Sequence, residues 1–96
     1  MTPDPSPWTL WFSNRFKVRY RKVKRRDPVL ARRVDVALAQ LLDSDDPTYL
    51  GEAKVGPLAR CFAYPLGDCR ILYTVHRDDE LIKCHRVCSH KEAYGP

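Results

Sequence analysis

The stretch GDCRILYTVH at residues 67–76 decides the fold of this chain. Its main part, residues 69–76, is apolar almost throughout, which predicts a central β-strand covered on both faces. The Gly-Asp pair at 67–68 predicts a turn before that strand. A partner strand is therefore expected over residues 58–66, on the other side of the turn.

The residues after the central strand predict that the chain turns back once more. The polar run Arg-Asp-Asp at 77–79 is typical of a turn, and a last strand is expected over 80–89. Residues 90–96 then form a short tail. Together these segments predict a three-stranded antiparallel meander.

The residues before the meander predict one strand and two helices. Residues 8–12 are mainly aromatic and apolar, which favours a short strand, and Ser13 is a suitable helix N-cap. Residues 14–26 contain no Gly or Pro and carry apolar residues at helical spacing. The Asp-Pro pair at 27–28 predicts the end of that helix and the start of a second one, which runs to about Leu42.

The predicted order is a strand, an αα-hairpin and a three-stranded meander. This is an α+β fold with helices on one face of a mostly antiparallel sheet. Ninety-six residues suffice for one small domain, which we place at 8–96 after a Pro-rich tail at 1–7. The loop between the second helix and the meander is long for a compact domain, and loops of that length tend to be functional.

The N-terminal residues predict neither export nor membrane insertion. The tail has no basic start and no apolar run of the kind found in secretory leaders. No apolar stretch approaches the roughly 18 residues that a membrane span needs. The sequence therefore predicts a cytoplasmic protein without a membrane partner.

The charge of the chain is concentrated on the first predicted helix. The net charge is +5, from 17 Lys and Arg against 12 Asp and Glu. Residues 14–26 hold no acidic residue that would pair with their basic ones. Such a face is either simply solvated or binds a polyanion, namely nucleic acid or an acidic protein segment. The candidate RNA-binding residues on this helix are Arg15, Lys17, Arg19, Arg21, Lys22, Lys24, Arg25 and Arg26.

The four cysteines do not follow the spacing of a zinc site. Cys84 and Cys88 are separated by three residues, and Cys61 and Cys69 are eight apart, whereas structural zinc sites use pairs of Cys-x-x-Cys type. Disulfides are not expected in a cytoplasmic protein. We therefore expect buried thiols, no metal and no cofactor.

Three segments resemble the RelE/ParE toxin superfamily. YLGEAKVGPL at 49–58 resembles its loop leading into the sheet, and GDCRILYTV at 67–75 resembles its central arginine-bearing strand. VCSHKEAYG at 87–95 resembles its ending, in which a His and a Tyr flank a short segment. The resemblance extends over residues 8–95. It implies a toxin of a toxin–antitoxin pair, neutralised by an antitoxin that wraps it with extended and helical segments.

The resemblance also implies a set of catalytic residues. RelE-like members enter the ribosomal A site and cut mRNA, whereas ParE-like members poison DNA gyrase. Arg70 matches the arginine that binds the phosphate, His90 suits proton transfer near neutral pH, and Tyr94 matches an aromatic that stacks or donates a hydrogen bond. Each has a structural alternative. Arg70 would form an ion pair with Asp68 or Glu80, His90 would be merely exposed, and Tyr94 would pin the tail to the core.

One departure from the family pattern bears on catalysis. The best-studied RelE type carries two lysines on the strand before the arginine, and this chain has Ala63 and Pro65 there. Proton transfer then falls to His90, or to Lys54 and Glu52 of the loop, or catalysis is weak or absent. The gap favours ParE-like members, which typically lack a complete catalytic set.

Further basic residues are expected around the phosphate, namely Lys54, Arg86 and Lys91. Strand alternation predicts Cys84, Arg86 and Cys88 on one face of the last strand, with His85 and Val87 on the other. His76 and His85 are predicted to be surface residues without a catalytic role.

The leading hypothesis is a ribosome-dependent mRNA endonuclease that cuts by attack of the 2′-hydroxyl, without a cofactor. Its expected partners are a cognate antitoxin, the ribosome and mRNA. The alternatives are a ParE-like gyrase inhibitor and a basic nucleic-acid-binding domain without catalytic activity.

Overall fold

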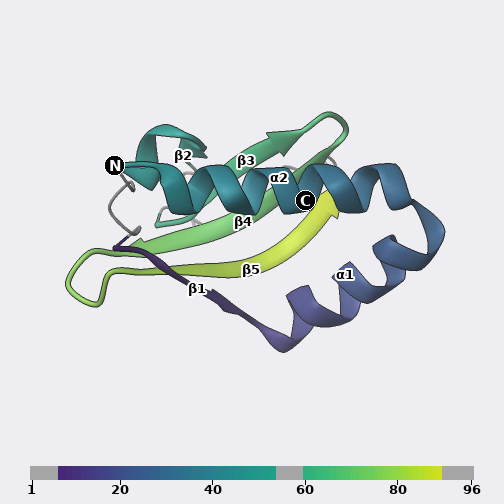
Figure 1. Ribbon diagram of the computed structural model, residues 1–96, viewed down its shortest axis with the longest axis horizontal. Helices are drawn as coiled ribbons and strands as arrows, with labels where there is room; N and C mark the ends of the chain where they lie inside the picture. The colour runs from purple at the N-terminus through teal and green to yellow at the C-terminus, as the bar shows by residue number, and fades with distance from the viewer. Residues whose placement is uncertain (1–6, 54–59, 90–96) are drawn as a thin grey trace, which may run out of the picture.

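The computed structural model describes residues 7–53 and 60–89 and shows an α+β protein (Figure 1). Its sheet has five strands in the order β1-β5-β4-β3-β2. The elements are β1 (Thr9–Phe12), α1 (Asn14–Arg26), α2 (Pro28–Asp43), the 3-10 helix η1 (Pro47–Tyr49), β2 (Glu52–Ala53), β3 (Phe62–Leu66), β4 (Cys69–His76) and β5 (Leu81–Ser89). The predicted fold class is therefore confirmed.

The strand pairing agrees with the predicted meander and adds one parallel pair. Strands β3, β4 and β5 are antiparallel neighbours. Strand β1 lies at one edge and pairs with β5 in parallel, from Thr9 opposite Leu81 to Phe12 opposite Cys84. Parallel neighbours need a long crossover, and the rest of the chain between β1 and β5 provides it. The sheet is therefore mixed.

The helix boundaries follow from local capping. The Ser13 hydroxyl accepts a hydrogen bond from the Phe16 amide at 3.0 Å, as an N-cap should, and donates one to the His85 carbonyl at 2.7 Å. This second bond ties the start of α1 to β5. The Asp27 carboxylate caps α2 by accepting from the Leu30 amide at 3.1 Å. The predicted cap at Ser13 is confirmed, and so is the predicted start of a second helix at the Asp27-Pro28 pair.

The long loop contains structure that the sequence analysis missed. η1 begins after Asp46, whose carboxylate accepts from the Thr48 amide, and the short strand β2 pairs with β3. The Tyr73 hydroxyl donates to the Pro47 carbonyl at 2.6 Å and so fastens this loop to the central strand. The predicted strand over 58–66 is shorter in the described residues, where β3 begins at Phe62. Residues 58 and 59 lie outside the described part.

The hydrophobic core lies between the two helices and one face of the sheet (Figure 1). We call this the helical face. α1 contributes Phe16 to this core, and α2 contributes Val34, Ala37 and Leu41. The fully buried or nearly buried members are Trp8, Phe16, Val34, Ala37, Leu41, Leu66, Ile71, Tyr73, Ile82, Cys84 and Val87.

A β-bulge in β5 overturns one prediction about side-chain direction. Leu72 pairs with Arg86 while Tyr73 pairs with Cys84, so His85 is an extra residue in β5. Cys84 and Val87 consequently both lie in the core, where regular alternation had placed them on opposite faces. The prediction was wrong because alternation holds only where both strands advance in step.

Cys61, Cys69 and Cys84 form no disulfide. Cys84 is fully buried, and burial raises its pKa to about 12, so it stays a protonated hydrophobic side chain. Cys61 and Cys69 are half-buried. Within residues 7–53 and 60–89 no three His, Cys, Asp or Glu side chains come together as a metal site requires.

Candidate nucleic-acid interface

The sheet face turned away from α1 and α2 carries Arg70, Arg86 and several further polar side chains, and we call it the outer face. Its members alternate with the core residues along the strands and pair with one another across strands. On β4 and β5 they are Arg70, Leu72, Thr74, His76, Lys83, His85 and Arg86; on the neighbouring strands they are Trp11, Glu52, Ala63 and Pro65.

Arg70 lies at the start of β4 and is held in place by its own turn. Its Nη1 donates to the Gly67 carbonyl at 2.6 Å and to the Cys69 carbonyl at 2.9 Å. The structural alternative expected an ion pair with Asp68 or Glu80, whereas the bonds that hold Arg70 are made to these two backbone oxygens. The two bonds use one nitrogen, so the guanidinium is oriented while Nε and Nη2 bond to no described residue. A fork held this way is suited to binding phosphate.

Arg86 lies beside Arg70 on the outer face. Arg70 pairs with Cys88 and Leu72 pairs with Arg86, so the two arginines are diagonal neighbours on adjacent strands. Backbone positions related in this way are about 7–8 Å apart, within the reach of two guanidinium groups toward one phosphate. The structure thus brings together two of the predicted site residues.

Strand β3 contributes no ionisable group to this site. Pro65 lies opposite Arg70 and Ala63 lies opposite Leu72, so these two residues occupy the outer face next to the arginine. The next residue across the sheet is Glu52 of β2, which pairs with Ala63. A carboxylate therefore lies in the same cross-strand row as Leu72 and Arg86. Of the two loop residues that were proposed for proton transfer, Glu52 is on the outer face, and Lys54 is outside the described residues.

Sequence reasoning missed a cluster of two histidines at the centre of the outer face. The Thr74 hydroxyl lies 2.8 Å from Nε2 of His76 and 2.8 Å from Nε2 of His85. Burial, the neighbouring His76 and the charge of Lys83 lower the pKa of His85, so its ring is neutral at pH 7. The bulge directs His85 to Thr74, and no sequence signal marks that bulge.

Trp11 and Lys83 extend the same face toward the β1 edge. The Trp11 side chain is 45% exposed, and the Lys83 ammonium lies 5.4 Å from its ring centroid. The Trp11 ring meets the His85 ring edge-on at a centroid distance of 6.4 Å. This arrangement combines an aromatic surface, a cation and a neutral imidazole.

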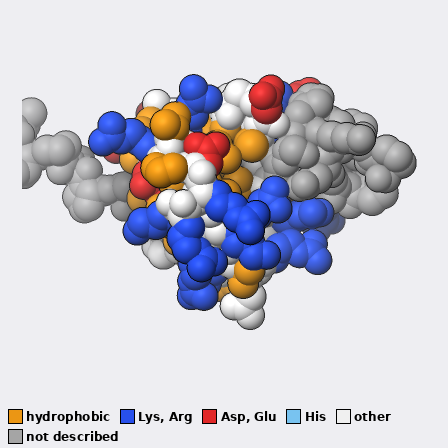
Figure 2. Space-filling model, turned by 90° about the vertical axis from the view of Figure 1, so that its right-hand side faces the viewer, with side chains coloured by type: hydrophobic (Ala, Val, Ile, Leu, Met, Phe, Trp, Pro, Cys, Tyr) orange, Lys and Arg blue, Asp and Glu red, His pale blue; other side chains and the backbone are white. Residues whose placement is uncertain are grey.

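The basic residues of α1 form a second positive surface. Phe16 and Val23 of this helix are buried, and all eight of its Lys and Arg side chains are exposed. Figure 2 shows Lys and Arg gathered over α1 in the lower half of the view. The prediction of a concentrated basic face on this helix is confirmed.

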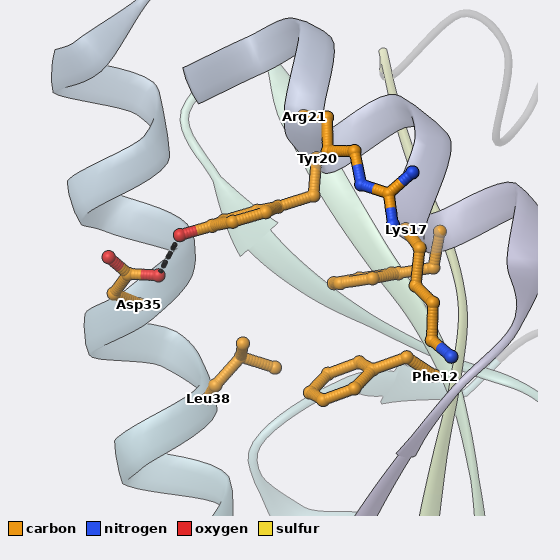
Figure 3. Close-up of a pocket in the computed structure, with 7 residues that line it drawn as sticks. Phe12, Lys17, Tyr20, Arg21, Asp35 and Leu38 are labelled. Carbon is orange, nitrogen blue, oxygen red and sulfur yellow. Dashed lines mark hydrogen bonds between the residues drawn. The ribbon is translucent and has the colours of Figure 1, made fainter. Parts of the chain in front are cut away.

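An apolar pocket with a basic rim lies between α1, α2 and the end of β1 (Figure 3). Its volume is about 300 Å³. Phe12 stacks on Phe16 and Phe16 stacks on Tyr20, whose hydroxyl donates to the Asp35 carboxylate at 2.6 Å. Lys17 and Arg21 of α1 also line the pocket. This lining suits an apolar side chain carried by an acidic segment.

Comparison with known proteins finds relatives by structure alone. No family model matches the sequence, and no curated protein matches it. A YoeB/ParE toxin from Agrobacterium tumefaciens superposes with a TM-score of 0.75 at 16% identity, covering 85% of this chain and 98% of that one. The chain has the RelE/ParE-type toxin fold.

Two further solved structures agree with this assignment. A YafQ mutant from E. coli matches with a TM-score of 0.72 at 12% identity, over 92% of this chain and 99% of that chain. The YoeB-YefM complex from Staphylococcus aureus matches with a TM-score of 0.69 at 18% identity, over 86% and 97%. At such low identity the RelE/ParE-type fold is shared, and activity has to be argued from the residues.

The remaining predicted site residues, Lys54, His90, Lys91 and Tyr94, lie outside the described part of this RelE/ParE-type fold. The last described residue, Ser89, shows where the chain leaves the sheet. Ser89 ends β5 opposite Cys69, the residue before Arg70. No helix among the described residues is long and apolar enough to cross a membrane.

Proposed function

We propose that this chain is the toxin of a type II toxin–antitoxin system and an endoribonuclease that cuts mRNA on the ribosome. The observation that supports it most is that Arg70 and Arg86 occupy diagonal positions on adjacent strands of the outer face of a RelE/ParE-type fold. Two guanidinium groups beside a shared phosphate position stabilise the charge that builds up during phosphodiester cleavage.

The proposed reaction needs a base, an acid and a group that stabilises charge. The 2′-hydroxyl oxygen attacks phosphorus as the base takes its proton, and the bond from phosphorus to the 5′-oxygen breaks as the acid protonates that oxygen. The products are a 2′,3′-cyclic phosphate and a 5′-hydroxyl. Arg70 is the charge-stabilising group, because its two carbonyl bonds hold it ready before substrate binds.

Proton transfer is assigned to His90, with Tyr94 stacking on a base or bonding to the scissile phosphate. The pairing of Ser89 with Cys69 supports this assignment, because it brings the backbone that leads into His90 next to Arg70. Glu52 is the second candidate base, because it shares the outer face with the arginines. Substituting His90 with Gln and Glu52 with Gln separates the two, since only the true base loses its limb of the pH–rate profile.

Cleavage is tested with purified ribosomes programmed with a defined message and primer extension of that message. Arg70→Ala should lower the cleavage rate by about 10²–10³, the usual cost of removing one transition-state donor. Arg32→Ala on α2 is the matched control, because it removes the same charge from an exposed position away from the outer face. Equal cleavage by Arg70→Ala and the parent protein would remove Arg70 from the site.

The basic face of α1 is assigned to ribosomal RNA, with Lys54, Arg86 and Lys91 adding charge near the mRNA phosphate. Binding through many phosphate contacts weakens steeply with salt. Lys22→Glu combined with Arg26→Glu should therefore weaken ribosome binding and flatten its salt dependence.

The antitoxin is expected to be an acidic or extended segment, and the pocket of Figure 3 suits one of its apolar side chains. The related YoeB from Staphylococcus aureus is found in complex with YefM, which supports a protein partner for this fold.

A gyrase inhibitor is the alternative that Ala63 and Pro65 favour, since β3 places no lysine beside Arg70. Expression of the chain in cells, followed by primer extension of a translated message and inspection of the DNA, separates the two functions. Codon-phased cuts in the message support the nuclease. Toxic expression with intact mRNA and damaged DNA supports gyrase poisoning. Salt-sensitive RNA binding without toxicity leaves a nucleic-acid-binding domain.

A further inference from the structure

We propose that Trp11 and Lys83 form a nucleotide-binding subsite for single-stranded RNA on the outer face. The RNA base stacks on the Trp11 indole, and the Lys83 ammonium binds the adjoining phosphate. The inference rests on the proposed function and extends it, because it adds a second point of contact for the RNA at a distance from Arg70.

Trp11 is an exposed aromatic surface in a strand whose other large residues are packed. Its neighbours Leu10 and Phe12 pack against the core, and Trp8 is 9% exposed against 45% for Trp11. Alternation turns the Trp11 side chain to the outer face, where Lys83 lies directly across from it. A large exposed indole on a face that also carries the phosphate-binding arginines has the character of a binding surface.

The Trp11 ring is held by its neighbours. The His85 ring meets its edge, and His85 is itself fixed by the hydrogen bond between its Nε2 and the Thr74 hydroxyl. A neutral His85 places no second charge beside Lys83. Because the indole is already ordered, a base that stacks on it loses little further side-chain entropy.

Lys83 can move aside without leaving the subsite. Its ammonium lies 5.4 Å from the indole centroid, where it makes a cation–π contact. At an exposed site such a contact is weak compared with stacking of a nucleobase on an aromatic ring. A base therefore displaces the ammonium from the ring, and the flexible lysine side chain keeps that charge within reach of the phosphate attached to the same nucleotide.

The subsite is continuous with the site at Arg70 and Arg86. Lys83 pairs with Thr74, which is four residues along β4 from Arg70, or about 13 Å at the usual rise of a strand. A single-stranded segment of a few nucleotides can run along β4 and β5 between them. The cations Arg70, Arg86 and Lys83 line this path. Glu52 is the carboxylate that the register of the described strands places on the outer face, and it lies at the β2 end of the sheet, away from Lys83. The charge along the path suits a polyanion, and the exposed Trp11 indole, on which a nucleobase can stack, favours RNA over an acidic protein segment.

Tryptophan fluorescence tests the subsite directly. The purified chain is titrated at low salt with a single-stranded oligoadenylate of about six nucleotides, and binding is followed separately by the anisotropy of a labelled copy. We expect RNA to quench the emission of the parent protein. In Trp11→Phe, where Trp8 alone emits, RNA should still bind and the quenching should be lost.

Substitutions measure the contribution of each group. Trp11→Ala should weaken RNA binding by roughly tenfold, as loss of one stacked base does, and Lys83→Gln should weaken it less and lower its salt dependence. Tyr49→Ala is the matched control, because Tyr49 is also an exposed aromatic, at 86%, and belongs to η1, which is bonded to Tyr73 on the helical face. Unchanged affinity in Trp11→Ala, or quenching that persists in Trp11→Phe, overturns the proposal.

The outcome can be separated from that of the proposed function. RNA that quenches Trp11 but is never cut supports the subsite and contradicts the nuclease. Normal cleavage by Trp11→Ala, at the same RNA concentration dependence as the parent protein, contradicts the subsite and leaves the nuclease intact. Weaker antitoxin binding by Trp11→Ala, with RNA binding unchanged, assigns this surface to a protein and also overturns the proposal.

Discussion

The contact between Gly51 and Tyr73 gives a prediction whose size can be worked out from the structure. The Tyr73 phenol is fully buried and donates to the Pro47 carbonyl at 2.6 Å. Burial raises the pKa of Tyr73, so the group remains a protonated donor. A Cβ atom on residue 51 would lie 2.5 Å from the phenol oxygen and 3.0 Å from two ring carbons. The loop carrying Glu52 thus depends on this close approach.

Each single substitution should destabilise the fold. Tyr73→Phe removes one of two hydrogen bonds to the Pro47 carbonyl, which keeps its bond from the Leu50 amide, at a cost of about 0.5–1.5 kcal/mol. Gly51→Ala forces an overlap with the phenol oxygen, at a cost of about 1–3 kcal/mol. Because Gly51 does not adopt a left-handed conformation, alanine is acceptable to the backbone and the contact accounts for the loss.

The double variant tests the reasoning. Removing the phenol oxygen leaves contacts of 3.0 Å, which small shifts of the ring relieve. The double variant should therefore be more stable than the sum of the two losses predicts, by about 1 kcal/mol. The free energy of unfolding is measured by urea denaturation followed by circular dichroism.

A matched pair provides the control. Tyr64 is a second tyrosine whose hydroxyl is bonded, to Gln40 of α2, and no Tyr64 atom is among the close neighbours of Gly51. Tyr64→Phe combined with Gly51→Ala should be additive within about 0.5 kcal/mol. If the Tyr73 and Gly51 effects are also additive, the proposed contact does not limit this loop.

Three further outcomes are expected. Ser13→Ala removes both the cap of α1 and the bond to the His85 carbonyl, so unfolding should become easier by about 1–2 kcal/mol in urea denaturation; Asn14→Ala is the control. Burial lowers the pKa of His85, so the folded state disfavours protonation of its ring. The resulting contribution to stability is full above the unfolded pKa of 6.5 and is lost as the pH falls through the lower folded pKa. His85→Gln should therefore flatten the decline in melting temperature between about pH 7 and 5 in thermal unfolding scans. Burial raises the pKa of the Cys84 thiol to about 12, so a thiol reagent at pH 8 should label Cys84 only after urea is added; rapid labelling of Cys84 in the native protein, identified by mass spectrometry, would contradict its burial.

Local signals made the helices and the central strand predictable. The caps at Ser13 and Asp27 act within one helical turn, so short-range chemistry sets where α1 and α2 begin. The apolar run of β4 is long enough to demand a buried strand wherever it pairs. The concentration of charge on α1 is likewise a property of the sequence, since the apolar spacing decides which helix face is exposed.

Some of the predicted catalytic residues could be identified from local sequence, and others depend on how distant strands pair. Arg70 could be singled out from its place after the Gly67 turn and from the family resemblance, and the structure adds that two backbone carbonyls hold it. The roles of His90, Tyr94, Lys54 and Lys91 remain predictions. Glu52 entered the sequence analysis only as a loop residue, and its pairing with Ala63 is what places it on the outer face.

What the sequence alone determined about this protein is the two helices α1 and α2, the strands β1, β3, β4 and β5, and the basic face of α1, because each depends on residues close together in the chain. The tertiary structure decided the parallel pairing of β1 with β5 and the bulge at His85. It thereby brought Trp11 beside Lys83, residues 72 positions apart, and turned His85 toward Thr74. Pairing of distant strands depends on how whole faces pack against α1 and α2, and a shift of one residue reverses every side chain beyond it. The composition of the outer face, where the proposed RNA chemistry lies, therefore follows from packing across the whole sheet.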